Sequence, residues 1–218
     1  GSSSINAMVY IRGAREDFEE WEEQGNKGWG WAEVLNAFRA MEDNSAGANE
    51  YRGVGGPLYI NDNARAMHAL YDPFIKASVA AGIPFNPDFN GETQEGVGNY
   101  QITTKNGRRN SAARAFLRPA MKRKNVKVET GAHATRILFE GKKAIGVEYV
   151  VNGQTRTAFG AREIIVSGGA INSPQLLQLS GIGPAALLKQ NGISVLQNNP
   201  NVGAHLQDHL GLNYTYRS

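Results

Sequence analysis

The chain has 218 residues, 41% of them hydrophobic, which allows one substantial core or one core with a partial second layer. Its formal net charge is only +3 and its basic residues are dispersed apart from Lys122–Lys124, so a solvated helix end is favoured there over nucleic-acid binding. The absence of cysteine excludes disulfide bonds, thiol catalysis and cysteine-bound zinc, and no apolar run is long enough to span a membrane.

The first part of the chain is predicted to be a Ser/Gly-rich loop followed by three helices. These helices are expected at residues 17–23, 32–41 and 67–81, the last ending at Gly82. A long loop at 84–98 follows, and long ordered loops are often functional. A short strand at 102–104 is then expected to lead into a turn at Asn106-Gly107.

Strands dominate the prediction for the second part of the chain. They are expected at residues 126–129, 136–140, 144–151, 155–159 and 164–167. The second and third are predicted to form a hairpin around Gly141, which the fourth extends. The fifth is an apolar run that predicts a buried strand.

A glycine turn, Gly168-Gly169, follows this last strand and is predicted to lead into a helix. Ser173 is expected to be the N-cap of that helix and Pro174 its first residue, where no N–H is needed. A second helix is expected between Pro184 and Gly192. A strand, glycine turn and helix in this order commonly bind a dinucleotide through the backbone, and taken alone they also allow a non-catalytic nucleotide-binding module.

Several segments resemble motifs of the glucose–methanol–choline (GMC) family of FAD-dependent oxidoreductases, and they occur in the same order as in that family. Residues 169–183 resemble its second signature, and residues 1–13 resemble the later part of its first signature. Its central and later sections are matched by residues 96–101, 106–113 and 202–209. The alternative that Gly1–Ser4 is a cloning remnant is disfavoured, because the family pattern continues unbroken from these residues to Gly13.

The resemblance implies an α/β (mixed α+β) fold, with part of an FAD-binding Rossmann-like domain and part of a substrate domain. Residues 1–50 would hold an FAD-contacting loop and helices, residues 51–120 part of the substrate domain, and residues 121–218 the return to the FAD-binding domain. The family's N-terminal βαβ unit and its C-terminal catalytic segment are not found in this sequence. The glycines at 25–30 do not replace the βαβ turn, because no apolar strand precedes them.

The cofactor implied by the resemblance is FAD, and eight residues are predicted to contact it. Ser hydroxyls and successive backbone N–H groups are suited to bind a phosphate or the edge of the flavin ring. The resemblance implies that the N-terminal loop contacts the flavin ring or the pyrophosphate. The family usually has Gly at position 7 and Val at position 134. The predicted cofactor-binding residues are Ser2, Ser3, Asn6, Ala7, Met8, Ala134, Ser167 and Gly168.

The implied reaction is oxidation of an alcohol to an aldehyde by hydride transfer to FAD. No catalytic residue is predicted, because His68, His133, His205 and His209 lack the surroundings of a general base. No metal-binding residue is predicted either. Tyr100 or the 84–98 loop are candidates to line a substrate cavity. The predicted partners are the remaining segments of the same enzyme and a small alcohol, with no nucleic acid and no membrane span in this chain. The chain alone is expected to be inactive, and the alternatives are a flavin-retaining lyase of the same family or the nucleotide-binding module.

Overall fold

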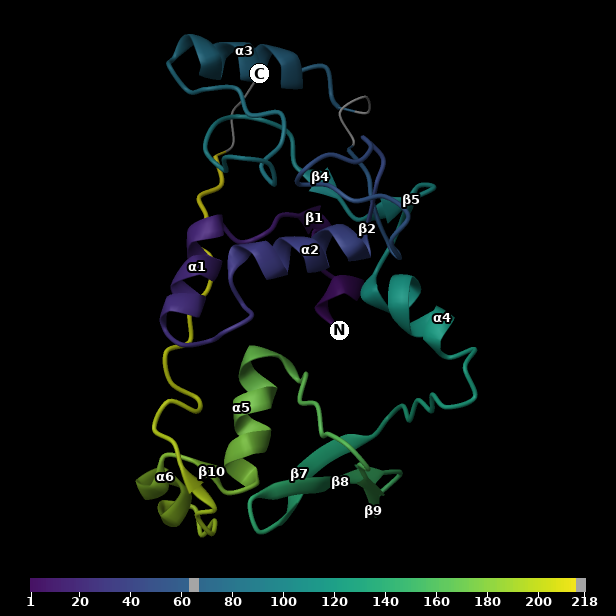
Figure 1. Ribbon diagram of the computed structural model, residues 1–218, viewed down its shortest axis with the longest axis vertical. Helices are drawn as coiled ribbons and strands as arrows, with labels where there is room; N and C mark the ends of the chain where they lie inside the picture. The colour runs from purple at the N-terminus through teal and green to yellow at the C-terminus, as the bar shows by residue number, and fades with distance from the viewer. Residues whose placement is uncertain (63–66, 215–218) are drawn as a thin grey trace. The chain divides into compact units, whose positions relative to one another are not determined.

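The computed structural model describes residues 1–62 and 67–214 and mixes helices with short strands, as predicted (Figure 1). The chain divides into two compact units, Gly1–Val128 and Glu129–Ser218. No helix among the described residues is long and apolar enough to cross a membrane. The assignment of the three regions to cofactor and substrate domains stays a prediction.

The first unit consists of short helices and two-stranded sheets. Its elements are η1 (Ser2–Ser4), β1 (Val9–Tyr10), α1 (Arg15–Glu23), α2 (Trp31–Met41), β2 (Glu42–Asn44), β3 (Leu58–Ile60), α3 (Tyr71–Ala80), β4 (Gln101–Ile102), β5 (Thr104–Lys105), β6 (Arg108–Arg109), the π-helical turn η3 (Ala113–Leu117) and α4 (Arg118–Ala120). Strand β1 pairs antiparallel with β4, β2 pairs parallel with β3, and β5 and β6 form a hairpin. The sequence-distant β1 and β4 are therefore neighbours.

The core of the first unit is partly aromatic. Phe18 of α1 is 8% exposed, and its ring lies 5.9 Å from those of Trp31 and Phe38 on α2. Ile60 on β3 is fully buried. Both helix predictions here are confirmed within two residues.

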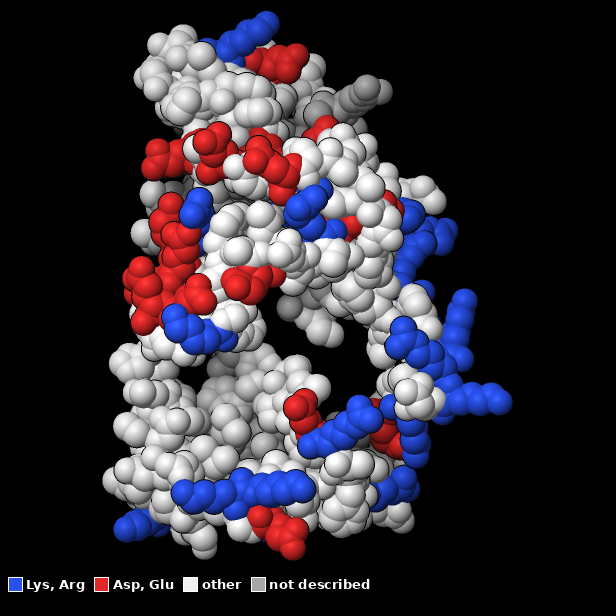
Figure 2. All heavy atoms as spheres, viewed as in Figure 1, with Lys and Arg blue, Asp and Glu red and all other residues white. Residues whose placement is uncertain are grey.

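Figure 2 shows acidic side chains gathered over α1, whereas Lys122–Lys124 after α4 are exposed, as a solvated helix end would be.

The other predictions for the first unit hold in part. Helix α3 begins at Tyr71 rather than at residue 67, and this start keeps Pro73 in the first turn, where its missing N–H breaks no helical bond. The expected strand at 102–104 is divided between β4 and β5. The turn at Asn106-Gly107 is confirmed, and both residues have the positive φ that a type I′ hairpin requires.

The second unit is built on a three-stranded antiparallel sheet. Its elements are β7 (His133–Glu140), β8 (Lys143–Val151), β9 (Gln154–Phe159), α5 (Gly169–Leu179), β10 (Ile182–Gly183), α6 (Ala185–Gln190) and β11 (Gln197–Asn198). The order β7-β8-β9 confirms the predicted hairpin and its third strand. The backbone N–H of Ile137 on β7 donates to the hydroxyl of Ser180 after α5, at 2.8 Å, which joins the helix to the sheet.

Two predicted strands are wrong. Residues 126–129 and 164–167 form no strand, and Ile165 is 81% exposed although its apolar neighbours predicted burial. A buried parallel strand needs neighbours on both edges, and the described residues supply none beside 164–167. The apolar sequence indicates that the segment is suited to burial. It forms no strand because the described residues provide no neighbouring strand to pair with it.

The start of α5 also differs from its prediction. The helix begins at Gly169 with Gly168 as N-cap, so Ser173 lies inside the first turns and Pro174 at the sixth helical position. Ser173 is still used, because its hydroxyl accepts a 2.9 Å hydrogen bond from the backbone N–H of Gly168. The helix therefore begins within the glycine turn, and the Ser173 hydroxyl stabilises that turn from a position inside the helix. The second helix, predicted between Pro184 and Gly192, is confirmed as α6.

Candidate functional site

The N-terminal loop, residues 1–8, is a compact turn whose predicted contact residues are mostly exposed. The backbone N–H of Asn6 donates to the carbonyl of Ser2 at 2.8 Å, which closes η1. The Asn6 side-chain oxygen accepts the N–H of Met8 at 3.1 Å. Met8 has φ +65°, a left-handed conformation that is uncommon for a residue with a Cβ. Ser2, Asn6 and Ala7 remain exposed, so the loop presents hydroxyls, an amide and a small residue to a ligand.

This loop is held by the segment from Thr103 to Ala112. The backbone N–H of Ala112 donates to the Ser3 hydroxyl at 3.1 Å. Arg109 Nη1 donates to the Ser3 carbonyl at 3.2 Å and to the Asn6 side-chain oxygen at 2.7 Å. The backbone N–H of Thr103 donates to the carbonyl of Met8 at 2.8 Å. Two segments that the sequence analysis singled out separately are therefore brought together, and the role of Arg109 was missed.

Behind the loop, β1 leads into a buried ionic cluster formed by Arg12, Glu42, Arg52 and Asp88. The fully buried Glu42 carboxylate accepts from Arg12 Nη2 and, at 3.3 Å, from Arg52 Nη1. Arg52 Nε also donates to Asp88 Oδ2 at 2.8 Å. Burial lowers the pKa of the Arg52 guanidinium despite the attraction of Glu42. Sequence reasoning did not predict this cluster, because isolated Arg and Glu residues usually lie on the surface.

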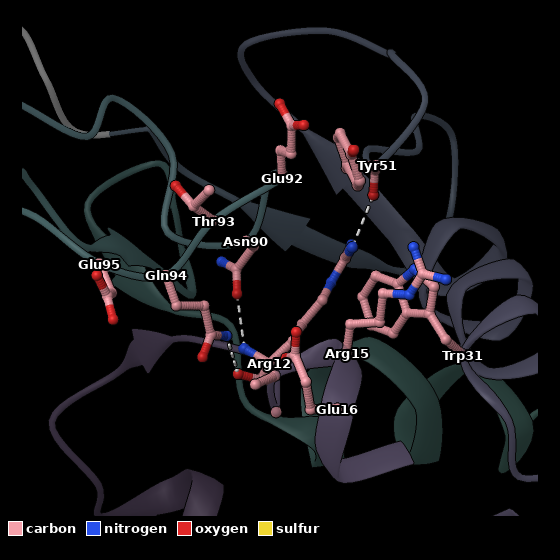
Figure 3. A pocket seen from close by; sticks show the side chains of 13 residues that line it. Arg12, Arg15, Glu16, Trp31, Tyr51, Asn90, Glu92, Thr93, Gln94 and Glu95 are labelled. Carbon is pink, nitrogen blue, oxygen red and sulfur yellow. Dashed lines mark hydrogen bonds between the residues drawn. The ribbon is translucent and has the colours of Figure 1, made fainter. Parts of the chain in front are cut away.

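A cavity of about 470 Å³ lies beside this cluster, between the start of α1 and the 84–98 loop (Figure 3). The loop closes on the chain through Asn90 Oδ1, which accepts the Arg12 N–H at 2.6 Å, and Gln94 Nε2, which donates to the Arg12 carbonyl at 2.7 Å. Figure 3 shows the Arg12 side chain directed to the Tyr51 carbonyl, at 2.6 Å from Nη1. Tyr100 packs instead on Phe89. A substrate role for the loop or for Tyr100 stays a prediction.

In the second unit, the predicted contact residues lie at the start of α5 and on β7. Ser167 and Gly168 are exposed just before the helix, whose first N–H groups have no helical acceptor. Gly169 has φ +91°, and a Cβ there would meet no atom within 4 Å, so space is open in front of the turn. Ala134 is an exposed residue of β7, paired with Tyr149 of β8. A cavity of about 630 Å³ lies between α5 and residues 201–206.

That none of the four histidines is a general base stays a prediction. All four are exposed, and none forms an ion pair with a carboxylate among the described residues. In the Asp208-His209 pair, the Asp208 carboxylate accepts the His209 backbone N–H at 2.8 Å rather than a ring nitrogen. No cluster of metal-binding side chains occurs among the described residues.

The residues present fit the donor requirements of FAD, whose phosphates and flavin carbonyls are hydrogen-bond acceptors. The N-terminal loop supplies exposed hydroxyls and a small Ala7 that permits close approach. The start of α5 supplies free N–H groups and the positive end of the helix dipole, with open space at Gly169. Each unit thus carries a suitable surface, and contact of any of the eight residues with FAD stays a prediction.

Comparison with known proteins gives a consistent result over nearly the whole chain. A family model described as GMC oxidoreductase matches residues 1–211. The mitochondrial choline dehydrogenase of Homo sapiens is 50% identical over 210 residues, covering 96% of this chain and 35% of the relative. An alcohol dehydrogenase [acceptor] of Pseudomonas putida is 47% identical, covering 97% and 39%. The crystal structure of pyridoxine 4-oxidase from Mesorbium loti superposes with a TM-score of 0.85 at 37% identity, covering 92% of this chain and 40% of that one.

Proposed function

Because this chain belongs to the GMC oxidoreductase family, we propose that it is one section of an FAD-dependent enzyme that oxidises an alcohol to an aldehyde. The observation that carries the proposal is the 50% sequence identity between this chain and a choline dehydrogenase over 210 residues. The chain spans only 35–39% of the curated relatives reported above, so the reaction belongs to a protein larger than this section. None of those relatives is named as a lyase, so no observation favours that alternative.

The proposed task of the first unit is to hold the reactive end of the cofactor. Loss of a hydride from the alcohol carbon requires an acceptor, and this is the chemistry that FAD supplies when bound. Asn6, Ala7 and Met8 would lie against the flavin, where Ala7 permits close approach and the Asn6 amide is both donor and acceptor. Ser2 and Ser3 would direct N–H and hydroxyl groups at acceptor oxygens, although the Ser3 hydroxyl already accepts a bond from Ala112.

The second unit would hold the cofactor at another point. The N–H groups at the start of α5, beside Ser167 and Gly168, are suited to anionic or carbonyl oxygen. The exposed backbone edge near Ala134 would pair with the adenine ring, and a backbone contact tolerates the loss of the larger side chain usual in the family. The base that removes the hydroxyl proton is not proposed from this section, because its histidines are exposed and have no carboxylate partner among the described residues.

The test uses the complete protein that contains this section. Purified protein should show flavin absorbance, and anaerobic addition of an alcohol should bleach it as the flavin is reduced. Choline is the first substrate to try, followed by a simple primary alcohol and pyridoxine, because relatives named for choline and pyridoxine share this section. Absence of flavin would favour a non-FAD nucleotide-binding module, and flavin that no alcohol bleaches would contradict the oxidation.

A further inference from the structure

The Arg109 side chain donates hydrogen bonds into the N-terminal loop. It lies on β6, whose register is set by the Asn106-Gly107 turn, and Thr104 is its partner across the hairpin. From there Nη1 donates to two acceptors in the loop, the Ser3 carbonyl and the Asn6 side-chain oxygen. A rigid hairpin therefore carries a charged donor to the centre of a loop that has no regular strand or α-helix.

The Asn6 oxygen is the point on which the loop conformation depends. It accepts both Arg109 Nη1 at 2.7 Å and the Met8 N–H at 3.1 Å. The second of these bonds closes a two-residue turn that keeps Met8 at its unfavourable positive φ. Without a fixed Asn6 side chain, the Met8 N–H would lose the acceptor that supports its positive φ, and only the bond from the Thr103 N–H to the Met8 carbonyl would hold this part of the loop.

The chemistry of arginine suits this task better than that of lysine. A guanidinium is planar and holds its donors in a fixed direction, so one nitrogen can serve a carbonyl and an amide oxygen at the same time. An ammonium on a flexible stem keeps the charge but fixes the two acceptors less well. The neighbouring Arg108 points to no partner among the described residues and is exposed, which makes it a natural comparison.

We propose that Arg109 is a positioning residue for FAD, which fixes the Asn6–Met8 backbone in the conformation that receives the flavin. The inference rests on the proposed function and adds to it a residue that does not itself need to touch the cofactor. Its effect passes through Asn6 and Ser3. Loss of Arg109 should therefore weaken FAD binding and alter the flavin surroundings while leaving the buried core of the first unit intact.

The experiment compares Arg109→Met, Arg109→Lys and the control Arg108→Met in the complete protein. Each apoprotein is titrated with FAD, and the visible spectrum and melting temperature are recorded. Arg109→Met should raise the Kd for FAD about tenfold or more, because two charge-assisted hydrogen bonds are lost. It should also shift the flavin spectrum, whereas Arg109→Lys should recover part of the affinity and Arg108→Met should behave as the unmodified protein.

Three results would overturn the proposal. One is an Arg109→Met variant with unchanged Kd and spectrum, and another is an equal loss in Arg108→Met. The third is an apoprotein of Arg109→Met whose melting temperature falls while the spectrum of any bound flavin is unchanged, since that indicates general destabilisation. Should Arg109→Met not accumulate, Arg109→Gln is measured in its place, because it keeps a polar side chain of moderate length but loses the guanidinium donor. Failure of the unmodified protein to bind FAD is a separate result, which overturns the proposed function itself.

Discussion

Replacing Glu42 by Gln should destabilise the protein strongly, although the two side chains have nearly the same shape. The Glu42 side chain is fully buried and lies between the guanidinium groups of Arg12 and Arg52. Its oxygens also accept from the Asn44 side chain at 2.7 Å and from the Gly53 N–H at 3.3 Å. A neutral amide leaves two buried cations without their shared anion, and its NH2 group must face other donors.

The expected size follows from the burial. Breaking a buried ion pair by removing one partner costs about 3–5 kcal/mol, and whole domains are stable by only about 5–15 kcal/mol. A fall in melting temperature of about 2–4 °C is expected in the complete protein, because each kcal/mol shifts the melting temperature less as a protein becomes larger. Strand β1 joins Arg12 to the N-terminal loop that is proposed to contact FAD. Disruption of the cluster should therefore lower the FAD content of the complete protein as well.

The control for this experiment is Asp43→Asn on the same strand. Asp43 is paired with Lys105 at 3.5 Å, and both side chains are partly exposed, so the charge should be worth about 1 kcal/mol or less. Both variants are melted under identical conditions by circular dichroism or calorimetry. Equal melting temperatures for Glu42→Gln and Asp43→Asn would refute the assignment of this cluster as a main source of stability in the first unit.

Three further outcomes are expected. Asn6→Leu should lower the flavin-to-protein absorbance ratio or shift the flavin spectrum of the complete protein, whereas His68→Ala should leave both unchanged; the reverse pattern would show that the cofactor is placed wrongly. Ser173→Ala should lower the free energy of unfolding by about 1 kcal/mol, because the Gly168 N–H loses its acceptor, and an unchanged urea midpoint would argue against it. Hydrogen bonds from Arg136 and Thr135 lower the pKa of Glu148, so its contribution to stability is present above the unfolded-state pKa and lost as pH falls through the folded one. An NMR titration should show that Arg136→Gln raises this pKa, and an unmoved titration would contradict the pairing.

The local parts of the fold could be predicted from the sequence because short-range chemistry determines them. The Asn106-Gly107 and Gly141 turns and the helix of Val34, Leu35 and Phe38 each carry their signal within a few residues. The strand expected at 164–167 failed because pairing depends on neighbours that a local pattern does not contain. Motif resemblance led to the prediction that the N-terminal loop contacts the cofactor, and that contact stays a prediction.

The supports of that loop were beyond reach of sequence reasoning. Arg109 lies within the motif at residues 106–113, yet nothing in the neighbouring sequence indicates that its partners are Ser3 and Asn6. Glu42 presents the same problem, since the sequence alone does not distinguish a buried carboxylate between two arginines from an ordinary surface acid. Both depend on long-range contacts, which become visible only when distant segments are brought together.

Those long-range bonds also set an order of events during synthesis. The bond from Arg109 to Asn6 spans 103 positions and that from Ala112 to Ser3 spans 109. At about 5–20 residues per second, the ribosome makes the loop roughly 5–20 seconds before its anchors exist. Closing so large a ring also carries an entropy cost that delays the contact further. With the proposed role of Arg109, the nascent protein would bind flavin at this loop only after the Asn106 hairpin has emerged and folded back, so cofactor loading would be a late step of maturation.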